Sequence, residues 1–156
     1  MTSTDDSTKA ATERPRRVGK RIYAIDRRRD ENEIITSFWL RPIDGEPLPD
    51  YLPGQFMTFA LPIPGERRPV FRSYSLSDSP HNADEGYRVS VKREPPPPSD
   101  PSLPPGIGSR FFHDEVDIGV ELTAVGPRGE FHLDVDSGRP VVLMSGDGGF
   151  QLSLQE

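Results

Sequence analysis

The sequence predicts an all-β domain, an antiparallel barrel or sandwich with one short helix. Short segments rich in β-branched and aromatic residues recur along the chain, and clusters of Pro, Gly and Asp separate them. Only 33% of the 156 residues are hydrophobic and 18 are proline, so a large part of the chain must form loops around one core.

The strands are expected in chain order, each bounded by turn residues. Apolar residues alternate with Arg and Lys over 17–29, and the run EIITSFWLRP at 33–42 is rich in β-branched and aromatic residues. A loop rich in Pro, Gly and Asp follows. The further strand segments are 55–61, 70–77, 87–93, 121–125 and 130–133, with a turn at 62–69, a polar loop through His81-Asn82 and a turn at 126–129.

One segment has helical spacing. From Ser109 to Val116, the residues Phe112 and Val116 lie four apart and share one helix face. Ser109 is a candidate N-cap, and His113 is expected on the helix surface. The preceding segment, 94–106, contains seven prolines in thirteen residues. An extended loop is favoured there over a ligand for a proline-binding module.

The two ends of the chain differ from the middle. Residues 1–15 are polar and predict a disordered arm. A continuous apolar run leads from Pro140 into Gly146 and resembles a buried parallel strand. Residues 139–156 are therefore interpreted as the start of a second, α/β nucleotide-binding domain of which only the first strand is present. The main domain is then 16–135.

Composition excludes several functional classes. The net charge of −6 argues against nucleic acid as a partner. The chain contains no cysteine, which excludes disulfides, thiolate catalysis and a cysteine-ligated iron–sulfur cluster within it. No two histidines have metal-ligand spacing, no apolar run is long enough to span a membrane, and no signal peptide is visible. A soluble, cytoplasmic protein without a metal site is expected.

The most informative motif is Arg72-Ser73-Tyr74-Ser75, followed about thirty residues later by Gly106-Ile107-Gly108-Ser109. In a strand, Arg72 and Tyr74 share one face at a separation of roughly 7 Å. A guanidinium suits phosphate and an aromatic side chain suits a flat ring. If the glycine-rich segment opens a helix, its N–H groups form a second anion site. Together the two segments predict a ligand that contains both phosphate and a planar ring.

Six motifs in a consistent order resemble the ferredoxin-reductase-type flavoprotein family. The nearest resemblance is to the reductase portion of flavohaemoglobins and to MOSC-associated oxidoreductases. The motifs are Pro53-Gly54-Gln55-Phe56, Arg72-Ser73-Tyr74-Ser75, Val89 to Glu94, Gly106 to Ser109 with Phe112-His113-Asp114, Gly126 to Phe131, and Val141 to Gly146. Each motif alone is weakly specific, whereas the six in this order are strongly specific.

The resemblance implies a six-stranded antiparallel Greek-key barrel that binds FAD. Arg72 would contact the FAD diphosphate, Tyr74 would pack along the isoalloxazine and ribityl, and Ser75 would be the catalytic residue near flavin N5. The other cofactor-binding residues that the resemblance implies are Phe56, Ser73, Ser90, Val91, Lys92, Gly106, Gly108 and Ser109.

The function implied by the resemblance is the FAD-binding part of an electron-transfer oxidoreductase. Electrons would pass from NAD(P)H through the flavin to an acceptor, with a separate NAD-domain or an electron-acceptor protein as partner. Whether the chain is an enzyme by itself stays open, because Asp147 lies where a pyrophosphate would approach and the rest of the nicotinamide domain is missing from the sequence. The alternatives are a non-catalytic flavin-binding or partner-docking barrel and an unstable truncated product.

Overall fold

Six antiparallel strands form one curled sheet in the order β4-β3-β6-β1-β2-β5. The computed structural model describes residues 19–132 together with 136, 138, 140 and 142. Its elements are β1 (Lys20–Asp30), β2 (Ile35–Pro42), β3 (Phe56–Leu61), β4 (Val70–Ser75), a 3₁₀ helix (Pro80–Glu85), β5 (Tyr87–Lys92), α1 (Ile107–Glu115) and β6 (Glu121–Arg128). Because β6 returns to lie between β3 and β1, the connectivity is a Greek key, and the predicted fold class is confirmed.

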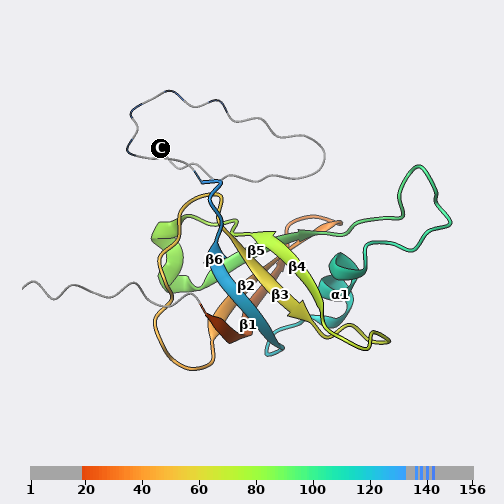
Figure 1. Cartoon of the computed structure of the whole chain (residues 1–156), viewed down its shortest axis with the longest axis horizontal. Coiled ribbons are helices and arrows are strands. Elements are labelled where there is room, and N and C mark those ends of the chain that lie inside the picture. Colours follow the sequence, from red (N-terminus) through yellow and green to blue (C-terminus); the bar gives the residue numbers. More distant parts are fainter. Residues whose placement is uncertain (1–18, 133–135, 137, 139, 141, 143–156) are drawn as a thin grey trace, which may run out of the picture.

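The sheet closes into a barrel only at one point. Its two edges, β4 and β5, meet through a single bridge between Leu76 and Val89, supported by the Ser77 N–H, which donates to the Arg88 carbonyl at 2.9 Å. Figure 1 shows α1 beside β4 at one end of the barrel, and the loop between β5 and α1 extending away from it. We call the gap between β4 and β5 beyond the Leu76 bridge the seam.

Alternation of apolar and polar residues explains the core. Along each strand, every second side chain points into the barrel. The buried inward residues are Tyr23 and Ile25 of β1, Phe38 and Leu40 of β2, Met57, Phe59 and Leu61 of β3, Tyr87, Val89 and Val91 of β5, and Leu122 and Ala124 of β6. In β4 no residue is fully buried, because this strand borders the seam.

Phe112 of α1 is the centre of the aromatic packing under the seam. Its side chain is fully buried, and its ring centroid lies 4.9 Å from that of Tyr74, 5.3 Å from Phe38 and 5.4 Å from Phe59. The pairs with Tyr74 and Phe59 are edge-to-face, a favoured geometry for aromatic rings, and the pair with Phe38 is tilted. Phe112 therefore joins the helix to β2, β3 and β4.

The expected turn at 126–129 and the expected strand at 130–133 are wrong for the described residues. β6 continues through Gly126 and a cis Pro127 to Arg128, which pairs with Phe56, whereas 130–132 form no strand. A bulge between Phe56 and Thr58 lets the two backbones approach closely. A side chain at Gly126 would begin 2.6 Å from the Met57 sulfur, so only glycine fits.

The helical segments also differ from expectation. α1 begins at Ile107 rather than at Ser109, and the loop through His81-Asn82 is a 3₁₀ helix. His113 is buried, not on the helix surface, with only 8% of its surface exposed. The reason is that α1 lies in the seam and is covered by the core on one side and by β5 on another. The segment 95–105 has no regular secondary structure, as expected.

Some expectations concern residues that the structure does not describe. The arm at 1–15, the strand within 141–146 and the turn that contains Asp147 lie outside the described residues. The domain limits at 135 and 139 lie in the same parts of the chain.

The packing of Phe112 leads to a stability prediction. Phe112→Ala should lower the free energy of unfolding by about 3–5 kcal/mol, because it leaves a cavity among three aromatic rings. Urea denaturation followed by far-UV circular dichroism would measure it. Phe71→Ala is the matched control: this side chain on β4 is 66% exposed, and its loss should change the free energy by less than about 0.5 kcal/mol. Equal effects of both variants would contradict the proposed role of Phe112.

Candidate functional site

A cavity of about 480 Å³ opens in the seam, where the two predicted motifs meet. This volume lies within the range of small-molecule sites, about 300–1,000 Å³. Its lining residues are Arg72 to Ser75 of β4, Ser90 and Lys92 of β5, Gly106 to Ser109 at the start of α1, and Ile35, Ser77 and Glu94. We call it the seam cavity.

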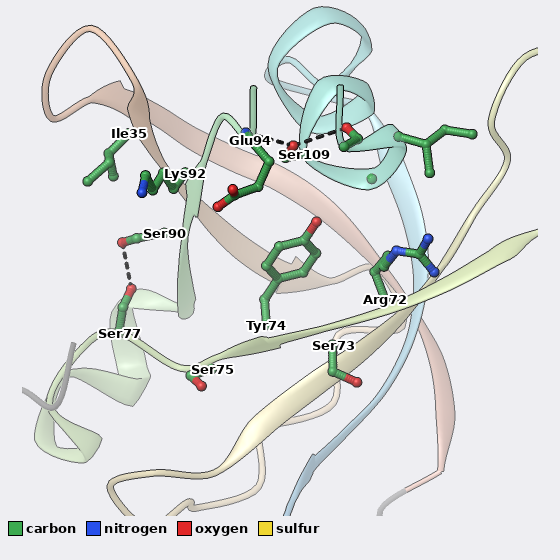
Figure 2. A pocket seen from close by; sticks show the side chains of 13 residues that line it. Ile35, Arg72, Ser73, Tyr74, Ser75, Ser77, Ser90, Lys92, Glu94 and Ser109 are labelled. Carbon is green, nitrogen blue, oxygen red and sulfur yellow. Dashed lines mark hydrogen bonds between the residues drawn. The ribbon is translucent and has the colours of Figure 1, made fainter. Parts of the chain in front are cut away.

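Arg72 and Tyr74 point toward the start of α1 from the same side of β4 (Figure 2). The Arg72 guanidinium donates to the Phe71 carbonyl at 2.8 Å and forms no ion pair within the described part of the chain. Gly108 allows both side chains to reach the helix: a methyl group there would begin 2.8 Å from Arg72 Cγ and 3.2 Å from the Tyr74 hydroxyl. The sequence prediction that Arg72 and Tyr74 share a face agrees with this arrangement.

Tyr74 is half-buried, with its ring against Phe112 and its hydroxyl near the helix start. Burial raises the pKa of Tyr74 to about 12, the Arg72 charge acts to lower it, and the Glu94 charge acts to raise it. The phenol is therefore neutral at ordinary pH and keeps its proton for donation.

Ser73 and Ser75 lie on the opposite side of β4 from Tyr74. Figure 2 shows both side chains directed away from the tyrosine ring, as the two-residue period of a strand requires. The Ser73 hydroxyl lies 2.8 Å from that of Thr58, and Ser75 is the cross-strand partner of Phe56. Both serines belong to the wall of the cavity, at the margin where β4 forms its edge.

Two hydrogen bonds join the start of α1 to Glu94, just after β5, and a third lies within the helix start. The Gly106 N–H donates to the Glu94 carbonyl at 3.1 Å, and the Glu94 N–H donates to the Ser109 hydroxyl at 3.0 Å. The Ser109 hydroxyl in turn donates to the Gly106 carbonyl at 3.1 Å. Ser109 is therefore not the N-cap; Gly106 occupies that position without a side-chain cap. The first N–H groups of a helix have no partner inside it, and Ile107 and Gly108, the first two residues of α1, line the cavity.

On β5, the Ser90 hydroxyl is the middle of a chain of three serines. It lies 2.8 Å from the hydroxyl of Ser77 and 2.8 Å from that of Ser37 (Figure 2 shows the first of these bonds). Lys92, two residues further along the same face, brings an ammonium group to the cavity. The predicted residues of β5 thus supply one ordered hydroxyl and one cation.

Two predicted site residues are not brought into the seam cavity. Val91 is fully buried in the core, and its carbonyl lies 2.9 Å from His113 Nε2. Phe56 lies across from Ser75 on β3, with the Arg128 guanidinium 5.6 Å from its ring centroid. The alternation that places Ser90 and Lys92 at the cavity directs Val91 into the barrel.

Sequence reasoning missed Glu94, Ser77 and Ile35 as lining residues. A signal for Glu94 was present, because Ser90, Lys92 and Glu94 continue one two-residue period past the end of β5. Ile35 had no such signal, since it lies on β2 and reaches the cavity only through the pairing of Ile35 with Lys92.

A second cavity of about 530 Å³ adjoins the first and shares Lys92 and Glu94 with it. Its remaining lining is Ile34, Arg93, Pro95, Pro96, Pro105 and Arg110. The two ends of the proline-rich loop therefore form an apolar surface next to the seam cavity.

Two further observations apply to the described residues. No three His, Asp or Glu side chains among them gather in a way that would hold a metal ion. None of their helices has the length and apolar character needed to cross a bilayer.

Comparison with known proteins identifies relatives over most of the chain. No family model matches it. The flavohemoprotein of Halalkalibacterium halodurans is 40% identical over 126 residues, which make up 81% of this chain and 29% of that protein. The chain therefore spans less than a third of the length of that curated relative.

Solved structures show the same fold. The flavohem-like FAD/NAD binding domain of nitric oxide dioxygenase from Vibrio cholerae superposes with a TM-score of 0.61 and 31% identity, over 72% of this chain and 45% of that one. Phthalate dioxygenase reductase, described as a modular structure for electron transfer from pyridine nucleotides to a 2Fe–2S centre, has a TM-score of 0.59 and 28% identity, over 75% of this chain and 32% of that one.

The burial of His113 next to the site leads to a prediction about pH. Burial, aided by the charges of Arg93 and Arg28, lowers the pKa of His113 below its ordinary value of 6.5, although the bond to Val91 acts in the opposite direction. The unfolded chain therefore binds this proton more readily than the native state. His113 should lower the free energy of unfolding progressively as the pH falls below about 6.5, and not above it.

Urea denaturation of wild type and His113→Gln at several pH values would test this. The variant should lose less stability than wild type on acidification, since this group no longer takes up a proton. His81→Gln, at an exposed position, is the control and should keep the wild-type pH dependence. If the free energy of unfolding of His113→Gln depended on pH as strongly as that of wild type, the prediction would be wrong.

Proposed function

Because the chain belongs to the ferredoxin-reductase-type family of FAD-binding barrels, we propose that it binds FAD in the seam cavity and forms the flavin-containing part of an electron-transfer oxidoreductase. One observation supports this most directly: a guanidinium, a half-buried aromatic ring and the glycine-rich start of a helix converge on one cavity. When bound, FAD supplies the redox chemistry between a reduced nicotinamide and an acceptor, whereas the protein supplies position and electrostatics.

The described residues fit a diphosphate. Arg72 offers a planar set of donors without a competing ion pair among the described residues, and the helix start offers N–H groups and the positive end of its dipole. Gly108 keeps the space between them open, because any side chain there would occupy it. In our proposal the diphosphate is bound between Arg72 and the segment Gly106 to Ser109.

The other residues receive roles according to their position. We propose that the Tyr74 ring packs against the flavin, since contact with the Phe112 ring keeps it in place. Ser75 and Ser73 lie at the margin of the cavity, where we propose that Ser75 contacts the reactive edge of the flavin, with Phe56 beside it. Ser90 and Lys92 would contact the chain between ring and phosphates, whereas Val91 has no role in this proposal because it is buried in the core.

The proposal also includes an electron donor and an electron acceptor. The solved relatives include a reductase described as transferring electrons from pyridine nucleotides to a 2Fe–2S centre, and the curated relatives are flavohemoproteins. We propose NAD(P)H as the donor and a haem or iron–sulfur group as the acceptor, each held by a part outside the described residues or by a separate chain.

The first test concerns Arg72. Arg72→Ala should weaken FAD binding by about 1.5–3 kcal/mol, the range for a hydrogen bond to a charged group. Isothermal titration of the apoprotein with FAD would measure it. Arg67→Ala, which removes an exposed arginine from the loop before β4, is the matched control and should bind FAD as wild type does. Unchanged affinity in Arg72→Ala would overturn the diphosphate assignment, and equal affinity for FMN and FAD would remove any role for the adenine half.

The second test concerns electron transfer. Hydride transfer requires the two rings to approach within about 3–3.5 Å, and the seam cavity is assigned to the flavin alone. We therefore expect FAD bound to the 156-residue chain to be reduced readily by dithionite but slowly by NAD(P)H, without saturation at about millimolar concentrations. Adding a chain that contains a nicotinamide-binding domain should restore saturable reduction.

Stopped-flow absorbance at the flavin band would record both reactions. Fast, saturable reduction by NADH in the protein alone would place the nicotinamide site on this chain. No recovery of reduction with any supplied nicotinamide domain would instead favour a barrel that binds flavin without catalysis.

A further inference from the structure

Glu94 is the one acidic residue that lines the seam cavity, among the residues that the structure describes. The other charged groups in the wall, Arg72 and Lys92, are cations, and the start of α1 adds the positive end of a helix dipole. Figure 2 shows the Glu94 side chain directed into the cavity, toward the space between Lys92 and Tyr74. Glu94 is exposed, so its carboxylate is accessible to a ligand bound in the cavity.

The position of Glu94 is fixed by its backbone. Its N–H donates to the Ser109 hydroxyl at 3.0 Å, and its carbonyl accepts from the Gly106 N–H at 3.1 Å. A Cβ on Gly106 would lie 2.8 Å from the Glu94 Cβ, so the side chain leaves the backbone directly beside the helix start. Because these contacts use the backbone, a substitution of the side chain leaves them in place.

The carboxylate itself has no hydrogen-bond or ion-pair partner among the described residues. Its charge nevertheless acts inside the cavity: it raises the pKa of Tyr74, whereas the charge of Arg72 lowers that pKa. An ionised carboxylate only accepts hydrogen bonds. It therefore repels a phosphate and attracts a group that donates, such as a hydroxyl.

We propose that Glu94 is a specificity-determining residue that accepts hydrogen bonds from the hydroxyl groups of a sugar-phosphate ligand and disfavours ligands that offer phosphate alone. The proposal rests on the proposed binding of FAD at this cavity. In FAD such hydroxyls occur on the ribityl chain and on the adenosine ribose. Both sources are chemically equivalent for a carboxylate, and Glu94 also lines the second cavity, so it lies where either one could reach it.

The test compares two ligands whose affinities should shift in opposite directions. Isothermal titration of the full chain with FAD and with inorganic pyrophosphate would be carried out on wild type, Glu94→Ala and Glu94→Gln. In Glu94→Ala, the Kd for FAD should rise about tenfold, because a hydrogen bond to a charged group is lost. The Kd for pyrophosphate should fall about threefold or more, because a like charge is removed.

Glu94→Gln separates charge from hydrogen bonding, since the amide keeps an acceptor oxygen. It should gain as much affinity for pyrophosphate as Glu94→Ala but lose less for FAD. Glu121→Ala and Glu121→Gln make the same changes at an exposed position on β6, outside the cavity, and both ligands should bind them as they bind wild type. Titration with FMN identifies the hydroxyls: equal weakening of FMN and FAD indicates the ribityl chain, and weakening of FAD alone indicates the ribose.

Two results would overturn the proposal. One is a shift of FAD and pyrophosphate in the same direction by the same factor, which would mean that Glu94 acts only as a general charge. The other is unchanged FAD affinity in Glu94→Ala. Failure of the wild type to bind FAD is distinguishable from both, because it would overturn the proposed function itself and this inference with it.

Discussion

The incomplete closure of the barrel is the constraint on which the site depends. β4 and β5 are joined by one bridge at Leu76 and Val89, and beyond it no ladder connects them. A sheet edge left open would expose backbone groups and core side chains to water. Here α1 fills the opening, so the start of α1, the edge of β4 and the end of β5 lie next to one another. The cavity is a consequence of how this barrel is completed.

The helix can fill the seam because two side chains hold it from different directions. Phe112 reaches the aromatic core, and His113 contacts the Val91 carbonyl of β5. The cavity wall includes the first turn of α1, where Gly108 lies one helical turn before Phe112 and has no side chain to fill the space. The core packs against Phe112 and His113, and the proposed ligand site lies at the first turn of the same short helix, so the geometry of that site depends on how the core holds α1.

Sequence reasoning recovered the parts of this arrangement that depend on local patterns. β-branched and aromatic composition between turn residues located the six strands, and the two-residue period placed Arg72 and Tyr74 together. Features set by pairing between distant segments were missed. Gly126-Pro127 has the composition of a turn, yet a bulge against Phe56 keeps it in β6. His113 has the spacing of a surface residue, yet the seam surrounds α1 on two sides. Glu94 was missed although it continues the two-residue period of Ser90 and Lys92, because it lies beyond the end of β5 and next to the proline-rich segment.

The charge distribution explains how an acidic chain can form a site for an anionic cofactor. The net charge of −6 would repel a diphosphate at long range, but screening in water limits that repulsion to about 10 Å at ordinary ionic strength. Within the cavity the field is set by Arg72, Lys92 and the helix start, which are all positive. Affinity therefore depends on local groups, and the single carboxylate of Glu94 changes the character of the cavity more than the remaining acidic residues on the surface do. Such a site distinguishes ligands by the order of their donor and acceptor groups along the cavity. The net negative charge of the chain cannot do this, because it disfavours every anionic ligand alike.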